Sequence, residues 1–138
     1  MNRGRFNNIY SVIAVVTPKG IPLVRDFYKV PSYWKFPGGH GAGSESPEDC
    51  AWRELLQETG IEVDFFELEK IHDEEKVDHK LFFFMITKSE APKINAFGDG
   101  GEQVDYFTLE RIQTMSDFFP SHLHLLRILQ QKITNPHT

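Results

Sequence analysis

The chain of 138 residues contains one cysteine, Cys50, and no apolar run of membrane-spanning length. A single cysteine cannot form an internal disulfide, and without a partner thiol Cys50 is interpreted as a helix residue rather than a nucleophile. The N-terminus is polar, and the apolar run from Tyr10 to Val16 is too short for a secretory signal or a membrane span. We therefore expect a cytoplasmic protein that does not bind membranes.

The chain also lacks an excess of positive charge. Its formal net charge is -5, which gives no general attraction to nucleic acid. Hydrophobic residues make up 40% and charged residues 25%, as in ordinary globular proteins. There is no internal repeat, linker or low-complexity tract. The length suits one domain covering residues 1–138.

The most informative stretch runs from Gly38 to Ile61. Ser46 followed by Pro47, with Asp49 three positions after the serine, is typical of a helix N-cap and first turn. Thr59-Gly60 is typical of a helix end, because glycine readily adopts the left-handed conformation found there. The sequence therefore predicts a helix from near Pro47 to near Thr59.

Projected at about 100° per residue, this helix has an apolar side and an acidic side. The apolar side carries Ala51, Trp52, Leu55 and Leu56; the acidic side carries Glu54, Gln57 and Glu58. Glu54 and Glu58 lie one turn apart and could share a cation, although a solvated acidic face would show the same pattern. The preceding glycines could let backbone amides approach an anionic ligand, or could simply form a flexible connection: Gly38, Gly39, Gly41 and Gly43. The lysine of a P-loop is absent.

The spacing of the fixed positions in this stretch resembles the Nudix box of the Nudix hydrolases. The matching residues are Gly39, Glu45, Arg53-Glu54-Leu55, Glu58 and Gly60-Ile61. The preceding Trp34-Lys35-Phe36-Pro37 is similar to the strand that leads into the box in that family. The resemblance implies an α/β fold, namely a Nudix-like α/β/α sandwich with a mixed β-sheet and the box loop and helix at the active site.

The same resemblance implies metal-dependent hydrolysis, with Mg²⁺ or Mn²⁺, of a diphosphate bond in a nucleoside diphosphate linked to another group. Glu54 and Glu58 would hold the metal, and one of them could also orient or deprotonate water. Glu45 and Arg53 would pair to fix the loop on the helix, with Gly60 as the third structural box residue. Candidate substrate contacts are Gly38, Gly39, His40, Arg25 and Tyr33. The family often forms dimers, so a homodimer stays open.

Gln57 departs from the family pattern, which usually has adjacent glutamates here. Its amide oxygen can still ligate a cation but brings no negative charge, so at least one metal should bind less tightly. Either the enzyme works with fewer tightly held metals, or the protein is a nucleotide-binding sensor or regulator. Because Glu54 and Glu58 are both present, we favour the enzyme. An isomerase of isoprenoid diphosphates would need a catalytic cysteine beside a pocket, and Cys50 lies inside the box helix.

Outside the box, residues 9–17 and 21–26 are β-branched segments around Pro18-Lys19-Gly20 and predict a hairpin. Residues 27–33 predict an aromatic loop that could stack on a base. Residues 61–71 and 80–86 predict two more apolar strands, the second of them central. The intervening segment, 72–79, predicts a solvated turn, with a zinc site as the weaker alternative.

The C-terminal third contains a long connection at 88–101 and an acid before a short strand. By resemblance, Glu102 is the candidate for a further metal ligand or catalytic base; Asp99 or Asp105 could serve instead, and a solvated loop acid is the alternative. A helix should begin at Leu109-Glu110, and another should cover residues 120–133. His122 and His124, near the start of the last helix, are interpreted as capping or surface residues.

Overall fold

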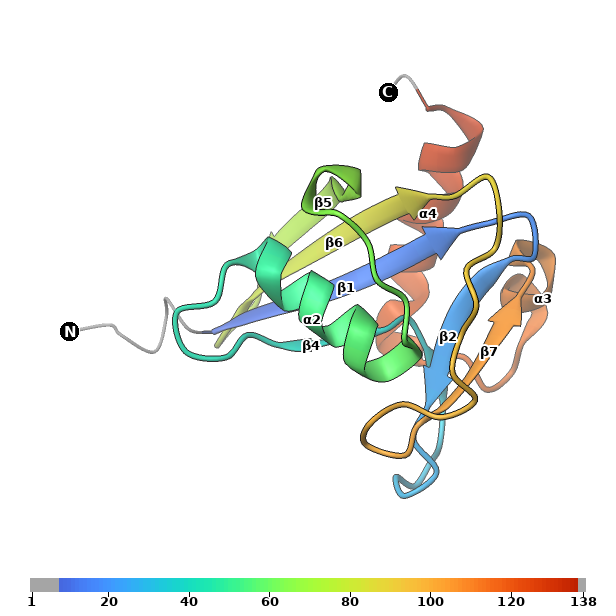
Figure 1. Ribbon diagram of the computed structural model, residues 1–138, viewed down its shortest axis with the longest axis horizontal. Coiled ribbons are helices and arrows are strands. Elements are labelled where there is room, and N and C mark those ends of the chain that lie inside the picture. The colour runs from blue at the N-terminus through green and yellow to red at the C-terminus, as the bar shows by residue number, and fades with distance from the viewer. Residues whose placement is uncertain (1–7, 137–138) are drawn as a thin grey trace.

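The computed structural model describes residues 8–136 (Figure 1). Two short 3-10 turns, η1 (Phe65–Glu67) and η2 (Pro120–His122), accompany the regular elements. The strands are β1 (Ile9–Val16), β2 (Ile21–Arg25), β3 (Trp34–Lys35), β4 (Gly38–His40), β5 (Glu69–Glu75), β6 (Lys80–Thr87) and β7 (Gln103–Phe107). The helices are α2 (Pro47–Thr59), α3 (Leu109–Thr114) and α4 (Leu123–Thr134). None of the helices within residues 8–136 is long and apolar enough to cross a membrane.

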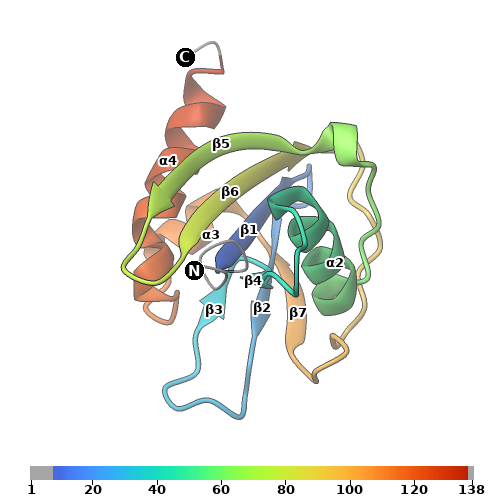
Figure 2. The ribbon, with the colours of Figure 1, turned by 90° about the vertical axis from the view of Figure 1, so that its left-hand side faces the viewer.

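The strands form two sheets. The larger sheet has the order β4-β1-β6-β5 and is mixed, because β1 and β6 are parallel while the other neighbours are antiparallel. The smaller sheet is antiparallel with the order β3-β2-β7. Figure 2 shows α2 and α4 on opposite sides of β1 and β6. The α/β architecture with a mixed sheet between helices is thus confirmed.

Alternation along β1 explains why both faces of the larger sheet are covered. Successive side chains of a strand point to opposite faces. Val12 and Ala14 join the apolar cluster under α4 and the smaller sheet, whereas Ile13 and Val15 join the cluster under α2. The run Phe83 to Ile86 in β6 divides in the same way. The prediction of an inner strand with two buried faces is therefore confirmed for β6.

The predicted hairpin of residues 9–17 and 21–26 is wrong. The turn itself forms, since Thr17 and Gly20 exchange two backbone hydrogen bonds of 3.1 and 3.0 Å. Beyond it the chain leaves the larger sheet, because both edges of β1 are already paired, with β4 and with β6. Strand β2 pairs instead with β3 and β7.

The region after the box helix also differs from its prediction. The sequence predicts a strand over residues 61–71 and a turn over 72–79, but β5 covers Glu69–Glu75 and the turn follows it. Strand β5 is an edge strand, and charged side chains suit an edge because they can reach solvent. Three of its acids pair with lysines: Asp73 with Lys70 at 2.8 Å, Glu69 with Lys132 of α4 at 2.9 Å, and Glu74 with Lys76 at 3.4 Å.

The C-terminal elements follow their predictions. Strand β7 and helix α3 form where expected, and η2 with α4 covers residues 120–134. Leu125, Leu126 and Leu129 of α4 pack into the core against the larger sheet. His122, however, takes the N-cap position of α4 without a side-chain capping hydrogen bond. It is not a surface residue, because its side chain is buried and accepts a hydrogen bond at Nδ1 from the Phe36 amide, at 3.3 Å.

Candidate active site

The loop before α2 and the helix itself are fixed by local caps. Ser46 Oγ accepts a hydrogen bond of 3.0 Å from the Asp49 amide, and Pro47 occupies the first turn. At the other end Gly60 has φ 81° and its amide donates to the Leu56 carbonyl. Both predicted helix ends are confirmed. The helix carries Ala51 and Leu55 into the core, with Cys50 buried beside them.

Arg53 joins the box loop to the helix. Its Nε and Nη2 contact the two carboxylate oxygens of Glu45 at 2.8 and 3.0 Å, a bidentate pair. Nη2 also donates to the His40 carbonyl, at 3.1 Å. The hydrogen bond from Arg53 holds the pKa of Glu45 below its usual value. Glu45 and Arg53 are therefore placed as the resemblance implies, with the loop tied to the middle of α2.

Glu54 lies directly against the backbone of β4. A Cβ atom at Gly39 would overlap the Glu54 carboxylate, so glycine is required for this approach. The carboxylate is mostly buried, with one ion-pair contact of 3.5 Å from Oε2 to Arg53 Nη1. Burial raises the pKa of Glu54, and the Arg53 charge opposes that rise. Glu54 is therefore a desolvated acid with only partial charge compensation.

Glu58 is held one turn further along the same helix. Its Oε1 accepts a hydrogen bond of 2.8 Å from the Gly38 amide. Burial raises the pKa of Glu58 to about 8, and the nearby charges of Glu54 and Glu102 add to the effect. An ionised carboxylate in this position would gain from a cation, because removing its charge from water is costly.

Glu102 approaches the same end of α2 from the loop before β7. Its Oε1 is buried and has no hydrogen-bond partner among the described residues. Gly98 lies between the two elements, since a Cβ there would stand 2.6 Å from the Glu58 carbonyl and 2.7 Å from Glu102 Oε1. The Asp99 amide donates to the Gln57 carbonyl, at 2.9 Å, and fixes this loop on the helix. Of the three candidate acids in this region, only Glu102 adds its charge to those of the helix carboxylates.

Gln57 contacts Arg53. Its side chain is exposed, and its Oε1 accepts a hydrogen bond of 3.1 Å from Arg53 Nη1. The amide oxygen expected to ligate a cation is therefore engaged with a guanidinium group. Because Arg53 Nη1 also lies 3.5 Å from Glu54 Oε2, the guanidinium links Gln57 to Glu54.

The smaller sheet supplies the other wall of the site. Lys35, Val24 and Val104 are paired across β3, β2 and β7 and so share one face. Helix α2 contacts β2, and Glu102 lies two residues before Val104. The Lys35 charge lowers the pKa of Glu58 and of Glu54, in opposition to burial. Sequence reasoning missed Lys35; the only signal was its place between the buried Trp34 and Phe36 just before the box.

The predicted substrate contacts are only partly brought together. Gly38 and Gly39 touch the two helix carboxylates, whereas the exposed His40 packs edge-on against the Tyr10 ring at 4.8 Å. The Tyr33 ring lies 5.9 Å from the Phe119 ring, which also neighbours Lys35.

Arg25, the remaining predicted substrate contact, lies elsewhere. It is opposite Trp34 in the sheet, on the face away from Lys35, and its Nη1 contacts Asp117 at 3.3 Å. The structure therefore separates Arg25 from the carboxylates.

Histidines gather elsewhere, beneath α4. His124 Nε2 lies 2.5 Å from Glu74 Oε1, and His72 Nε2 lies 3.7 Å from the same oxygen. Burial lowers the pKa of His122 to about 3, so this ring is neutral. Across residues 8–136, no three histidine, cysteine, aspartate or glutamate side chains are arranged to hold a metal ion as they stand. The zinc alternative for residues 72–79 receives no support from the described part of the chain.

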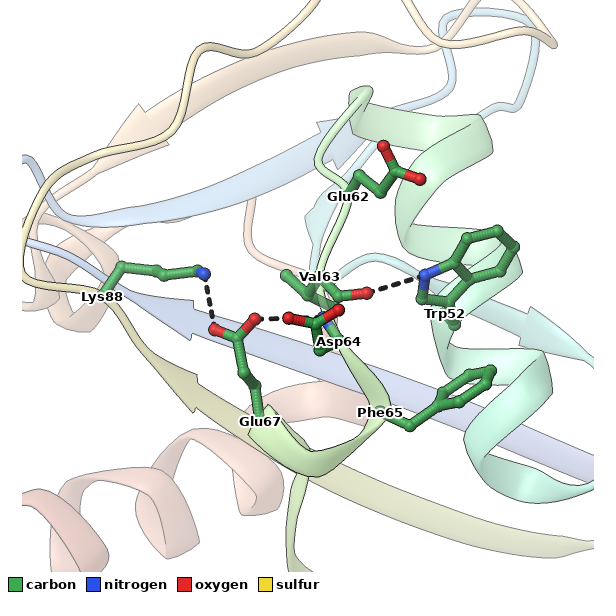
Figure 3. Close-up of a pocket in the computed structure, with 7 residues that line it drawn as sticks. All are labelled: Trp52, Glu62, Val63, Asp64, Phe65, Glu67 and Lys88. Carbon is green, nitrogen blue, oxygen red and sulfur yellow. Dashed lines mark hydrogen bonds and ion pairs between the residues drawn. The ribbon is translucent and has the colours of Figure 1, made fainter.

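A cavity of about 580 Å³ lies on another side of α2 (Figure 3). Trp52, which lines it, leaves the helix about 200° from Glu54, because the two residues are two positions apart. Polar groups around this cavity bond to one another: the Trp52 indole donates to the Val63 carbonyl at 2.8 Å, and Lys88 pairs with Glu67 at 2.5 Å. None of the box carboxylates lines it. The candidate site is therefore the surface between α2 and the smaller sheet, because the box carboxylates lie there and not at this cavity.

The donor set of that surface suits a hard divalent cation. Mg²⁺ and Mn²⁺ prefer carboxylate oxygens; Glu54 and Glu58 offer two desolvated carboxylates, and Glu102 offers a third with an unpartnered buried oxygen. Because these groups do not yet form a metal cluster, a cation would have to draw them together. The residues fit such a cation because their ligand atoms are carboxylate oxygens and because few positive groups of the protein offset the negative charge of the ionised carboxylates.

The fold and the site define an α/β protein in which a glycine-rich loop and a capped helix present acids beside a small sheet. The chain belongs to the NUDIX domain family, whose model matches residues 7–127.

Two relatives are similar over part of the chain. The 8-oxo-dGTP diphosphatase of Buchnera aphidicola is 36% identical over 78 residues, covering 54% of this chain and 60% of that protein. Mouse nucleoside diphosphate-linked moiety X motif 6 is 34% identical over 61 residues, covering 44% of this chain and 20% of that protein. The chain thus spans less than two thirds of each of these relatives.

A solved structure shows the same fold. The bifunctional NMN adenylyltransferase/ADP ribose pyrophosphatase of Francisella tularensis, solved with AMP and a manganese ion, matches with a TM-score of 0.73 at 20% identity. The match covers 91% of this chain and 42% of that one.

Proposed function

We propose that the protein hydrolyses a diphosphate bond in a nucleoside diphosphate linked to another group, with Mg²⁺ or Mn²⁺. The observation that carries this proposal is that the desolvated carboxylates of Glu54 and Glu58 lie against the backbone of Gly39 and Gly38. The charge of Glu102 acts on both of them. Membership of the NUDIX family and the activity named for the Buchnera relative, a diphosphatase, support it. The Francisella protein was solved with manganese, which supports the choice of metal.

In this proposal Glu54, Glu58 and Glu102 would hold the cation, which would screen the diphosphate charge and lower the pKa of the attacking water. The Gly38 amide orients Glu58 by donating a hydrogen bond to Oε1, which leaves the second carboxylate oxygen, Oε2, to bind the cation in this proposal. Glu58 keeps a proton at neutral pH until a positive charge displaces it, because burial raises its pKa to about 8. Arg53 and Glu45 fix the loop that carries these contacts.

A second candidate is a nucleotide-binding sensor or regulator that has lost catalysis. Gln57 favours it, because this position brings no charge and its Oε1 accepts from Arg53. The two candidates differ in turnover. A sensor would bind nucleotide tightly and release no product.

The test is a screen of nucleotide substrates with the purified chain and Mg²⁺ or Mn²⁺, in which phosphate is measured with and without an added phosphatase. We expect product from at least one nucleoside diphosphate derivative. Glu58→Gln should lower that rate by at least about a hundredfold, because it removes a buried charge at the site. Glu62→Gln, the same chemical change at an exposed loop position, should leave the rate unchanged. Inactivity across the panel together with tight nucleotide binding would support the sensor instead.

A further inference from the structure

We propose that Lys35 binds the phosphate groups of the substrate and supplies a fixed positive charge to the site. This inference rests on the proposed function, because it concerns the ligand of the same surface. It explains how a site with an amide at position 57 can still neutralise a diphosphate.

The register of the smaller sheet places Lys35 on the correct face. Its neighbours in the strand, Trp34 and Phe36, are buried, with 6% and 1% of their surface exposed. Side chains alternate along a strand, so the Lys35 side chain points away from that core. It shares its face with Val24 and Val104, which lie toward α2 and Glu102.

The Lys35 ammonium has no anionic partner in the described part of the chain. Within residues 8–136 it makes no hydrogen bond and no ion pair, and its close neighbour is the Phe119 ring, at 5.9 Å. Most other charged groups near the core are paired, such as Arg53 with Glu45 and Arg25 with Asp117. A half-buried cation without a partner, close enough to affect two carboxylates, is suited to an anionic ligand.

The charge balance of the site makes such a ligand group useful. Glu54, Glu58 and Glu102 repel a diphosphate, and a divalent cation offsets only part of that repulsion. With Gln57 in place of an acid, the site has less charge with which to hold further cations. The Lys35 ammonium, a compact positive charge on a flexible stem, can replace part of the positive charge that these further cations would have supplied.

The inference is tested by binding of methylenediphosphonate, a diphosphate analogue with a carbon bridge that is not hydrolysed. Its affinity for the purified chain is measured by calorimetry, once with EDTA and once with Mg²⁺. Lys35→Met should weaken binding by at least about tenfold in both conditions, the value of one charge-assisted hydrogen bond. Lys35→Arg should restore most of the affinity, because it keeps the charge. Lys93→Met, the same change at an exposed position, should bind as the wild type does.

Steady-state kinetics add a second readout on any substrate that the screen finds. A phosphate-binding role predicts that Lys35→Met raises KM, with or without a fall in kcat, whereas a purely structural role would lower thermal stability and leave KM unchanged. Circular dichroism shows whether the variants are folded.

The inference is overturned if folded Lys35→Met binds the analogue as tightly as the wild type, or if the wild type does not bind it in either condition. Failure of the proposed function looks different. In that case the wild type hydrolyses no nucleotide, yet binding of the analogue still depends on Lys35.

Discussion

The buried carboxyl of Glu58 should make the metal-free protein less stable as the pH rises. Its pKa is raised from 4.5 to about 8 in the folded chain by burial, whereas the unfolded chain ionises it freely. The folded state therefore holds one more proton than the unfolded state between these pH values, and the free energy of unfolding falls with increasing pH. Above pH 8 the loss is complete.

The useful window is pH 6.5 to 8. Below pH 6.5, His122 makes the free energy of unfolding rise with increasing pH. Its pKa is lowered from 6.5 to about 3 in the folded chain, so the unfolded chain binds more protons in that range. Within the window, about 1.5 pH units at about 1.4 kcal/mol each give a loss of about 2 kcal/mol. Burial also raises the pKa of Glu54 above 4.5, so its contribution to the pH dependence has the same sign.

The assay is urea unfolding with EDTA at several pH values in this window. The wild type should lose about 2 kcal/mol of unfolding free energy between pH 6.5 and 8. Glu58→Gln should show a much flatter profile and exceed the wild type at pH 8, whereas Glu62→Gln should follow the wild type. Saturating Mg²⁺ should stabilise the wild type more at pH 8 than at pH 6.5. A flat wild-type profile, or an equal slope in Glu58→Gln, would refute the reasoning.

Two further predictions concern a neutral histidine and the missing acid. The ring resonances of His122 in NMR spectra should keep their neutral positions from pH 8 down to about pH 4, because burial lowers its pKa to about 3; a transition near 6.5 would show that the ring is solvated. Gln57→Glu should tighten Mn²⁺ binding by about tenfold or add a further ion, measured by titration, because a carboxylate brings charge that an amide lacks. Unchanged affinity and stoichiometry would show that Arg53 retains the new carboxylate.

The sequence predicts the box helix well because its signals are local. Ser46, Pro47 and Gly60 set its ends through contacts within a few residues, and the positions of Glu54 and Glu58 follow from the helical repeat. The same holds for β6, whose continuous apolar run fits a strand that is covered on both faces. These features need no knowledge of distant partners.

Pairing between distant segments could not be predicted in the same way. The turn at Thr17–Gly20 is visible in the sequence, but whether β1 and β2 then pair depends on β4 and β6, which occupy both edges of β1. The place of Lys35 depends on the register of β3, β2 and β7, and the isolation of Arg25 from the carboxylates follows from the same register. The alternation of side chains along one strand predicts which residues share a face. It does not predict which of the two faces packs against α2.

We propose above that Glu54, Glu58 and Glu102 together hold a divalent cation. A titration of the metal-free chain with Mn²⁺, followed by the loss of the free-ion signal in electron paramagnetic resonance, tests it most directly. We predict saturable binding that weakens by more than about tenfold in Glu58→Gln and in Glu102→Gln, while Glu62→Gln binds as the wild type does. Binding of equal strength in the wild type and in folded Glu58→Gln would contradict the account.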